Sequence, residues 1–278
     1  MEYESPAHPE GPVRVKTAYE FLRQKGLTFI EPKPCKEEDI LLVHSQGLLA
    51  AVKNGKFSDP DTPNLKGIFE YACLAAGSAI QAQGAALKGE NAFSLMRPPG
   101  HHAGRNTLGG FCYFNNIAIA IEKALTKVKK AAILDLDCHH GNGTQDIFFN
   151  DQRLLYVSLH QSPLYPGTGL TSERNCLNYP LPAGTDEKTY LLALAQAIEK
   201  IREYKPEIIG ISLGLDTYKN DPLTNLGLEI STYRKIGEMI SSAEIPGFAV
   251  LEGGYSLELG ECLYEFIGGW EGKNNVVG

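Results

Sequence analysis

The sequence predicts a single α/β domain over residues 1–278, built on a mainly parallel sheet with helices on both faces. Short apolar runs alternate along the chain with longer segments whose apolar residues recur at helical spacing. Because the short runs are apolar throughout, both faces of the sheet must be covered, which is typical of parallel strands. The chain has no internal repeat and no Pro-, Ser- or Gly-rich linker, so we expect one domain rather than several.

Five strands and four helices account for this alternation. The strands are expected at 91–96, 131–137, 154–159, 207–213 and 247–251, and the helices at 67–87, 115–128, 188–204 and 231–244. Every strand delivers polar side chains to its carboxyl end: His101 and His102, then Asp137 and His139, then Ser158, Asp216 and Tyr255. Open α/β sheets place their ligand crevice at that edge, so the five strand ends indicate one polar site.

Composition excludes several classes of protein. Hydrophobic residues at 43% and charged residues at 21% are ordinary globular usage. The chain lacks both an apolar run long enough to span a membrane and an N-terminal signal pattern, which excludes membrane and Sec-exported proteins. A net charge of -7 argues against nucleic-acid binding. Six cysteines without CxxC spacing indicate reduced thiols, so we expect a cytoplasmic protein.

A metal site is predicted where the second strand ends. Asp135, Asp137 and His139 alternate, so an extended chain points all three to one face, with neighbours ~7 Å apart. Carboxylates with an imidazole suit zinc or iron, and Asp216 is the obvious third ligand. Three protein ligands leave an open position, as in catalytic sites. For an isolated Asp-x-His triplet, the preferred interpretation would be that Asp137 is a helix cap and His139 a buried core histidine. The tandem histidines and Asp216 elsewhere in the chain favour metal binding instead.

The tandem histidines and one tyrosine are candidates for catalysis. His101 and His102 follow a glycine turn, and a histidine there suits a general base near neutral pH, although exposed loop histidines are the alternative. Tyr255 follows two glycines and could donate a hydrogen bond to a developing oxyanion, with plain packing as the alternative. Cys138 should face away from the ligands, which indicates a core residue rather than a nucleophile.

Seven segments in order along the chain resemble one known family. They are RPPGHHA, GFCYFNNIAIA, DLDCHHGNGTQ, YVSLH, PGTG, LGLDTYKNDPL and LEGGY, and with the HPE segment at His8 they extend to Tyr255. Together they resemble the zinc-dependent histone deacetylase superfamily, closest to its class II branch. That superfamily includes acetoin-utilisation-type proteins of bacteria and archaea and acetylpolyamine amidohydrolases. The resemblance implies the arginase/deacetylase fold, a three-layer αβα sandwich with eight mainly parallel strands.

The resemblance also implies the metals. One zinc per chain, with ferrous iron as an alternative, would be bound by Asp137, His139 and Asp216. A structural potassium ion would be bound by Asp135, Asp137, His139, Ser158 and Leu159.

The catalytic residues follow from the same motifs. His102 matches the general base better than His101, whose aspartate partner would be Asp135. Asn142 falls where the second histidine has its partner, an asparagine in class II enzymes. Tyr255 matches the tyrosine that polarises the amide carbonyl.

Substrate contacts are implied for a further set. Phe111 and Tyr165 would form an aromatic pair that lines the acyl-lysine tunnel, with Gly110 beside them. Asp61, with Asp59 as its competitor, would hold the substrate at the rim, which Leu223 would also line. Arg14 would belong to the acetate-release cavity.

Two departures from the family pattern shape the expected function. Only seven residues precede His8, so the family's first strand is expected to be missing, through a fragment, a mis-chosen start or a true short form. Leu223 lies seven residues beyond Asp216, where some acetylpolyamine enzymes carry a glutamate. An apolar residue there favours acyl-lysine in proteins or peptides as the substrate.

Three alternatives stay open at this point. They are an acetylpolyamine amidohydrolase, a binuclear manganese ureohydrolase and a non-catalytic acetyl-lysine binder. The expected partners are acetylated peptides or small amines, with no nucleic acid and no membrane. The oligomeric state is left open.

Overall fold

The computed structural model describes residues 3–272, whose centre is a single sheet of six strands. The strand order is β1-β6-β5-β2-β3-β4, and every neighbouring pair is parallel. The parallel α/β sheet is therefore confirmed, with six strands in the described residues rather than the family's eight. The strands are β1 Ala92–Ser94, β2 Ala131–Asp135, β3 Leu154–Gln161, β4 Cys176–Leu181, β5 Ile208–Leu213 and β6 Gly247–Leu251.

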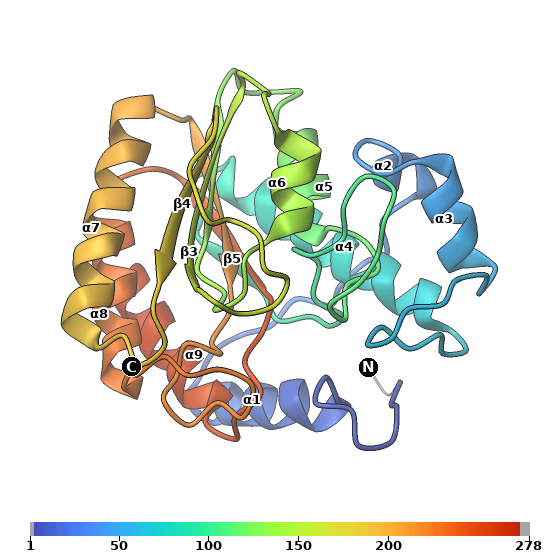
Figure 1. The fold of residues 1–278 in the computed structure, drawn as a ribbon, viewed down its shortest axis with the longest axis horizontal. Helices are drawn as coiled ribbons and strands as arrows, with labels where there is room; N and C mark the ends of the chain where they lie inside the picture. Colours follow the sequence, from blue (N-terminus) through green and yellow to red (C-terminus); the bar gives the residue numbers. More distant parts are fainter. Residues whose placement is uncertain (1–2, 273–278) are drawn as a thin grey trace.

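Helices cover both faces of the sheet, which gives the predicted three layers (Figure 1). One layer contains α1 Pro12–Gln24, α7 Glu187–Tyr204, α8 Ile230–Ser241 and α9 Leu259–Trp270. The other contains α2 Glu37–Ile40, α3 Gln46–Lys53, α4 Ile68–Ala86, α5 Asn116–Ala124 and α6 Asn142–Phe148.

Side-chain alternation along the strands explains why both layers are needed. In β2, Ala132 and Leu134 belong to the core under α7 and α8, whereas Ala131 and Ile133 belong to the core under α4 and α5. All four are fully buried. Because successive side chains of a strand point to opposite faces, an apolar strand needs a helix layer on each side.

The end of β2 differs from the prediction. The strand stops at Asp135 rather than at residue 137. Beyond it the Asp137 amide donates to Asp135 Oδ1 (3.2 Å) and the His139 amide to Asp137 Oδ1 (2.8 Å). Aspartate side chains that capture nearby amides form turns in place of ladder hydrogen bonds. The extended alternation expected over residues 135–139 is thus wrong, because the chain leaves the strand after Asp135 and bends over residues 137–139.

Six elements have no counterpart among the predicted ones. They are the helices α1, α2, α3, α6 and α9 and the strand β4, which lies at the edge of the sheet and pairs only with β3 within the described residues. β4 contains Pro180, and proline lacks the N–H of a ladder, so it is tolerated in strands mainly at edges. Residues 3–11, ahead of α1, hold no strand.

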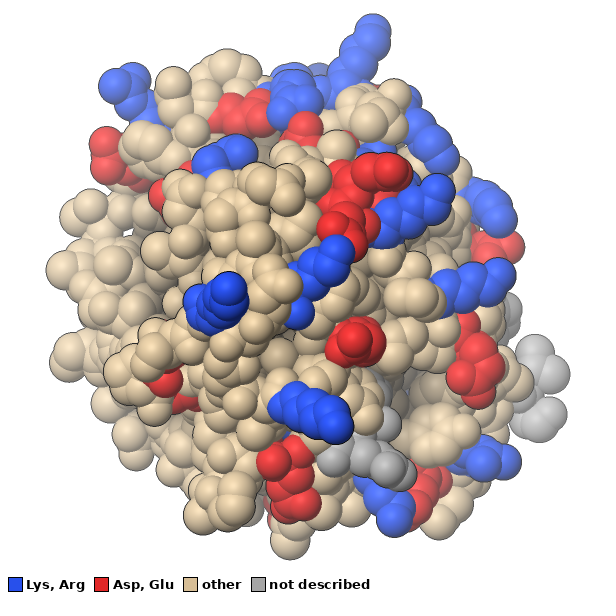
Figure 2. All heavy atoms as spheres, turned by 90° about the vertical axis from the view of Figure 1, so that its right-hand side faces the viewer, with Lys and Arg blue, Asp and Glu red and all other residues tan. Residues whose placement is uncertain are grey.

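The surface over α2 and α3 carries charges of both signs. Figure 2 shows basic and acidic side chains interspersed on this face, without a continuous stripe of one sign. Two ion pairs here join Lys53 to Glu37 (2.7 Å) and Lys123 to Asp39. Within residues 3–272, the helices are all too short or too polar to cross a membrane.

Candidate active site

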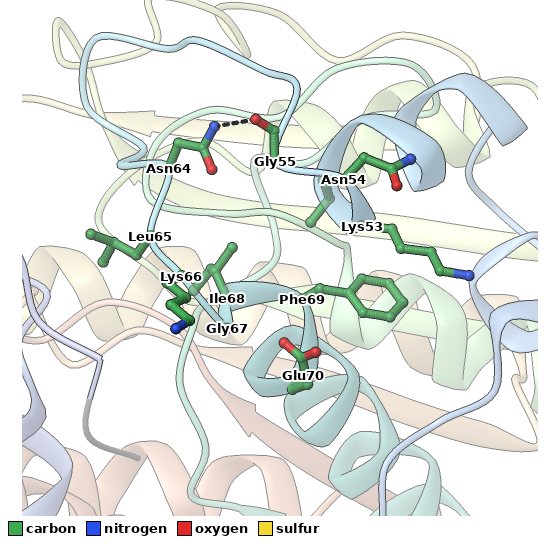
Figure 3. Close-up of a pocket in the computed structure, with 11 residues that line it drawn as sticks. Lys53, Asn54, Gly55, Asn64, Leu65, Lys66, Gly67, Ile68, Phe69 and Glu70 are labelled. Atoms are coloured by element: carbon green, nitrogen blue, oxygen red, sulfur yellow. Dashed lines mark hydrogen bonds between the residues drawn. The ribbon is translucent and has the colours of Figure 1, made fainter.

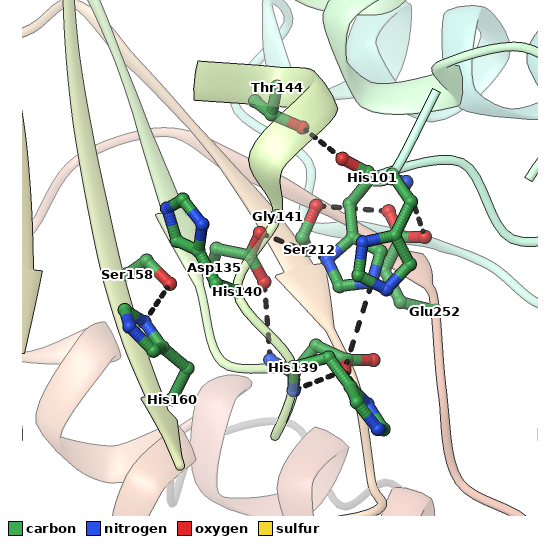
Figure 4. A network of polar contacts seen from close by, with 12 residues as sticks. His101, Asp135, His139, His140, Gly141, Thr144, Ser158, His160, Ser212 and Glu252 are labelled. Atoms are coloured by element: carbon green, nitrogen blue, oxygen red, sulfur yellow. Dashed lines mark hydrogen bonds and ion pairs between the residues drawn. The ribbon is translucent and has the colours of Figure 1, made fainter. Parts of the chain in front are cut away.

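Polar side chains that follow strands β1, β2 and β5 meet at the carboxyl edge of the sheet, where Figure 4 shows His101 and His139. The loop after β2 carries Asp137 and His139, and the loop after β5 carries Asp216. The loop after β1 carries His101 and His102 to the same place. The crevice position expected from the strand ends is where these residues converge.

Three of these residues form a cluster with the geometry of a metal site. Ligand atoms of Asp137, His139 and Asp216 all lie within 4.8 Å of one another. His139 Nδ1 is 3.0 Å from Asp137 Oδ1 and 2.9 Å from Asp216 Oδ2. Asp216 Oδ2 is buried, and its contact with His139 is an ion pair without a hydrogen bond in the described chain. A buried carboxylate oxygen without a hydrogen bond is costly unless it ligates something, so the cluster fits a cation.

Electrostatics point the same way. Burial and the neighbouring Asp137 carboxylate raise the pKa of Asp216 to about 7. Burial also acts to raise the pKa of Asp137, but His101 and His139 outweigh it and lower that pKa below its usual range. Two carboxylates facing one imidazole leave the cluster short of positive charge, which a divalent cation would supply.

The tandem histidines have unlike partners. His101 Nδ1 lies 3.2 Å from Asp135 Oδ2, and His102 Nδ1 lies 2.8 Å from Asn142 Oδ1. The two rings are stacked at a tilt, with centroids 4.0 Å apart. Because an amide oxygen only accepts, the Asn142 contact places the proton of His102 on Nδ1 and leaves Nε2 as an acceptor.

The pKa values of the two histidines diverge. Burial alone would lower the pKa of His101, but the Asp137 and Asp135 carboxylates raise it to about 10. Burial lowers the pKa of His102 well below 6.5, and the charges of His101 and His139 lower it further. His102 is therefore neutral near pH 7, the state that a proton acceptor needs.

Aromatic rings surround the approach to the cluster. Tyr165 packs edge-on against His102 with centroids 5.0 Å apart, and Phe111 packs against Tyr255 at 5.9 Å. Gly110 lies directly against the first pair, because a Cβ there would stand only 2.4 Å from the His102 ring and 3.0 Å from the Tyr165 ring. Its φ of +56° also lies in the left-handed region that favours glycine.

Of the two competing aspartates at the rim, Asp61 contacts Gly110 beside the aromatic rings. Asp61 Oδ1 accepts a hydrogen bond from the Gly110 amide (3.1 Å), while Asp59 Oδ1 accepts one from the Asp61 amide (3.2 Å). Burial and the nearby Asp59 carboxylate raise the pKa of Asp61. Leu223 is exposed, with its amide held by Asp221 Oδ1 at 2.9 Å.

Arg14 reaches the site from α1, 240 residues away in sequence. It donates to the carbonyl oxygens of Gly254 and Glu252, and its guanidinium lies 4.8 Å from the centroid of the Tyr255 ring. Its Nη1 is buried without a hydrogen bond in the described chain, although Glu10 Oε1 lies 3.5 Å away. A buried donor of this kind can hold a carboxylate or a carbonyl.

Three of the residues expected to bind potassium lie side by side and are buried. Asp135 in β2 is the register partner of Ser158 in β3, followed by the buried Leu159. Asp135 Oδ2 also accepts from the Tyr156 hydroxyl (3.0 Å), and Ser158 Oγ lies 2.9 Å from His160 Nδ1.

Sequence reasoning missed two residues that position the site. Glu252 Oε2 accepts from the amides of Gly100 (2.7 Å) and His101 (3.1 Å) and so anchors the histidine loop. Burial raises the pKa of Glu252 to about 7. Asp221 Oδ2 accepts from the Tyr255 amide (2.7 Å). An acidic residue directly after a buried strand is a signal that could have identified Glu252, whereas Asp221 lies in a loop without such a signal.

Cavity volume does not identify this site. A cavity of about 260 Å³ lies between the end of α3 and the start of α4, lined by residues that include Lys53, Asn64 and Glu70 (Figure 3). None of the residues lining it belongs to the cluster. The site is recognised by its converging polar atoms.

Comparisons with known proteins agree with this geometry. The family described as "Histone deacetylase domain" matches residues 8–268. A protein of Archaeoglobus fulgidus named "Probable deacetylase" is 41% identical over 284 residues, covering 92% of this chain and 78% of that protein. "Acetylpolyamine amidohydrolase 2" of Pseudomonas aeruginosa is 39% identical over 228 residues, covering 77% and 66%. The solved HDA15 HD domain superposes with a TM-score of 0.88 at 30% identity, covering 96% and 83%. The chain therefore belongs to the histone deacetylase family, whose members hydrolyse amides.

Proposed function

We propose that the chain is a zinc-dependent deacetylase that removes acetyl or other acyl groups from the ε-amine of acyl-lysine in proteins or peptides. The observation that carries the proposal is the Asp137–His139–Asp216 cluster beside a neutral His102. A bound zinc or ferrous ion would lower the pKa of a coordinated water towards about 7 and polarise the amide carbonyl.

The chain's own residues supply the proton transfers. His102 Nε2 accepts a proton from the attacking water, because Asn142 keeps the other ring nitrogen protonated. His101, held charged by the Asp137 and Asp135 carboxylates, stays an imidazolium beside it. The proton then passes to the leaving amine, which completes amide hydrolysis without a covalent enzyme intermediate.

Tyr255 stabilises the transition state. Burial raises the pKa of Tyr255, so its phenol keeps its proton and can donate to the developing oxyanion. Asp221 holds its backbone and the Phe111 ring packs against it. Phe111 and Tyr165 line the path of the acyl-lysine side chain, with Gly110 and Asp61 at its mouth, and Arg14 Nη1 receives the released acetate.

The proposal includes a structural potassium ion at the end of β2. Asp135 and Ser158 would contribute side-chain oxygens to it, and Asp137, His139 and Leu159 would contribute the remaining ligand oxygens. A hard cation suits such oxygen ligands. The six free cysteines support a cytoplasmic location, and residues 1–278 are assigned to a single deacetylase domain.

Substrate choice has a second candidate. Exposed Leu223 offers an apolar rim, which suits a lysine side chain within a peptide. The paired carboxylates of Asp59 and Asp61 could instead attract a second ammonium, as in an N-acetylated polyamine. Relatives with names of both kinds match this chain.

The two remoter candidates have less support. A binuclear ureohydrolase needs a second set of metal ligands, and the described residues contain one such cluster. Asp135, the nearest spare carboxylate, contacts His101 and Tyr156. A non-catalytic binder would not need a neutral histidine and a protonated tyrosine beside the cluster.

Acetate release by zinc-reconstituted protein tests the proposal. An acetyl-lysine peptide and N-acetylputrescine are compared at equal concentrations, with metal-stripped protein as the control. We expect turnover of the peptide that requires the metal. Preference for N-acetylputrescine would keep the chemistry and overturn the substrate, while tight binding without any acetate release would overturn the enzyme. Two tightly bound manganese ions per chain would favour the ureohydrolase.

A further inference from the structure

Two cysteines distant in sequence lie together where the segment before α2 runs along α4. The Cys35 amide donates to the Cys73 carbonyl oxygen at 2.9 Å. Standard backbone dimensions then limit the separation of the two Cα atoms to about 6.8 Å, within the range of disulfides. The thiols are close enough to set each other's pKa: their hydrogen bond raises the pKa of Cys35 and lowers that of Cys73.

The segment that carries Cys35 is fastened along α4. The Lys33 amide donates to Gln81 Oε1 (2.6 Å), and Gln81 Nε2 donates to the Glu31 carbonyl oxygen (3.3 Å). Gly77 of α4 allows the segment to lie this close, since a Cβ there would stand 1.9 Å from the Lys33 carbonyl oxygen. The approach of the two backbone segments that carry the thiols is therefore built into the fold.

Reactivity also distinguishes Cys73, whose pKa is lowered, from the four thiols outside the pair. Burial raises the pKa of the other four thiols, which makes them poor nucleophiles; these are Cys112, Cys138, Cys176 and Cys262. Cys35, by contrast, is partly exposed, so a small oxidant can reach the pair.

We propose that Cys35 and Cys73 form a reversible disulfide when the protein meets a peroxide. One thiolate attacks a peroxide oxygen, the O–O bond breaks, and a sulfenic acid and hydroxide result. The second thiol attacks that sulfur, an S–S bond forms, and water leaves with the thiol proton. In balance, two thiols are oxidised, hydrogen peroxide is reduced to two waters, and a dithiol reductant reverses the change.

The disulfide would close a loop that contains α2, α3 and the rim aspartate Asp61. A cross-link over a loop of this length lowers the entropy of the unfolded chain. Oxidised protein should therefore unfold at a higher temperature than reduced protein. The catalytic cluster contains no cysteine, so the chemistry does not require the bond.

Peptide mapping after peroxide treatment tests the proposal. Full-length protein is treated with hydrogen peroxide, alkylated and digested. We expect one cross-linked peptide joining Cys35 to Cys73, lighter by two hydrogen atoms and lost after dithiothreitol. The melting temperature of the intact, peroxide-treated protein should rise by several degrees.

Variants separate the pair from the other thiols. Cys35→Ser should abolish both the cross-link and the melting shift, and Cys262→Ala, a buried control on α9, should retain them. Full alkylation of Cys35 and Cys73 after peroxide, or a cross-link through other cysteines, would overturn the proposal. Because Cys35 is partly exposed, its serine variant keeps the test valid even where Cys73→Ala fails to fold.

Discussion

His102 Nδ1 is held by a neutral partner, Asn142 Oδ1 at 2.8 Å, although the neighbouring His101 faces a carboxylate. This difference decides which histidine is neutral near pH 7. Burial and nearby positive charge lower the pKa of His102 below 6.5, and an amide partner adds little to oppose that.

Asn142→Asp should therefore move the pH dependence of kcat/KM. A carboxylate beside Nδ1 stabilises the imidazolium and raises the pKa of His102, so the acidic limb should shift upward by about one pH unit. Activity then appears only at higher pH, because the base must be neutral. The pH profile of acetate release measures this, with the exposed Asn54→Asp as a control of equal charge. An unmoved limb would remove His102 from the role of base.

Asp216→Asn should abolish metal retention. The amide keeps the shape of the side chain but replaces a charged ligand atom in a cluster of three. Metal analysis after dialysis measures the loss, and Asp186→Asn, at the exposed N-cap of α7, should retain the metal. Full zinc occupancy in the Asp216 variant would count against the ligand assignment.

Tyr255→Phe should keep the metal and lose at least ~10-fold in kcat, because one oxyanion donor contributes that much or more. The change removes only the hydroxyl, so packing against Phe111 and Arg14 is preserved. Steady-state kinetics with parallel metal analysis make the comparison, and Tyr264→Phe on α9 is the control. Unchanged turnover would exclude Tyr255 from the chemistry.

Leu223→Glu should shift substrate preference towards N-acetylputrescine. A carboxylate on the exposed rim can pair with the free ammonium of that substrate, and exposed pairs contribute about 0.2–1 kcal/mol. The ratio of kcat/KM for N-acetylputrescine to that for the acetyl-lysine peptide should rise about 1.4- to 5-fold. Leu192→Glu, exposed on α7, should leave the ratio unchanged. An unchanged ratio in the Leu223 variant would show that Leu223 does not contact the distal part of the substrate.

Glu10→Ala should destabilise the fold through Arg97. The Arg97 guanidinium is completely buried and makes hydrogen bonds of 2.7 Å to both Glu10 carboxylate oxygens. Removing one partner of a buried ion pair typically lowers the free energy of unfolding by about 3–5 kcal/mol. Denaturant titration measures this loss in the free energy of unfolding. The double variant Glu10→Ala/Arg97→Met should recover part of the loss, and a single variant as stable as wild type would contradict the prediction.

Local patterns were sufficient for most of the sheet core and for the candidate metal ligands. Runs such as 131–135 are apolar at every position, which predicts a strand covered on both faces without knowledge of its neighbours. Asp137, His139 and Asp216 were identified because carboxylates and imidazoles after such strands must meet at one edge. The end of β2 was misjudged, since side chain–amide turns at Asp135 and Asp137 replaced the extended chain.

The sequence by itself thus determined the class of the fold, the edge where the site lies and the chemistry of its ligands, because these follow from periodicity and residue type. Only the tertiary structure decided which groups hold the site in place. Arg14 contacts Glu252 and Gly254 across some 240 residues, and Glu252 in turn holds the histidine loop. The meeting of Cys35 with Cys73 was likewise decided by the fold. Such contacts depend on strand order and on how loops pack over the sheet, and neither is encoded in the local spacing of residues.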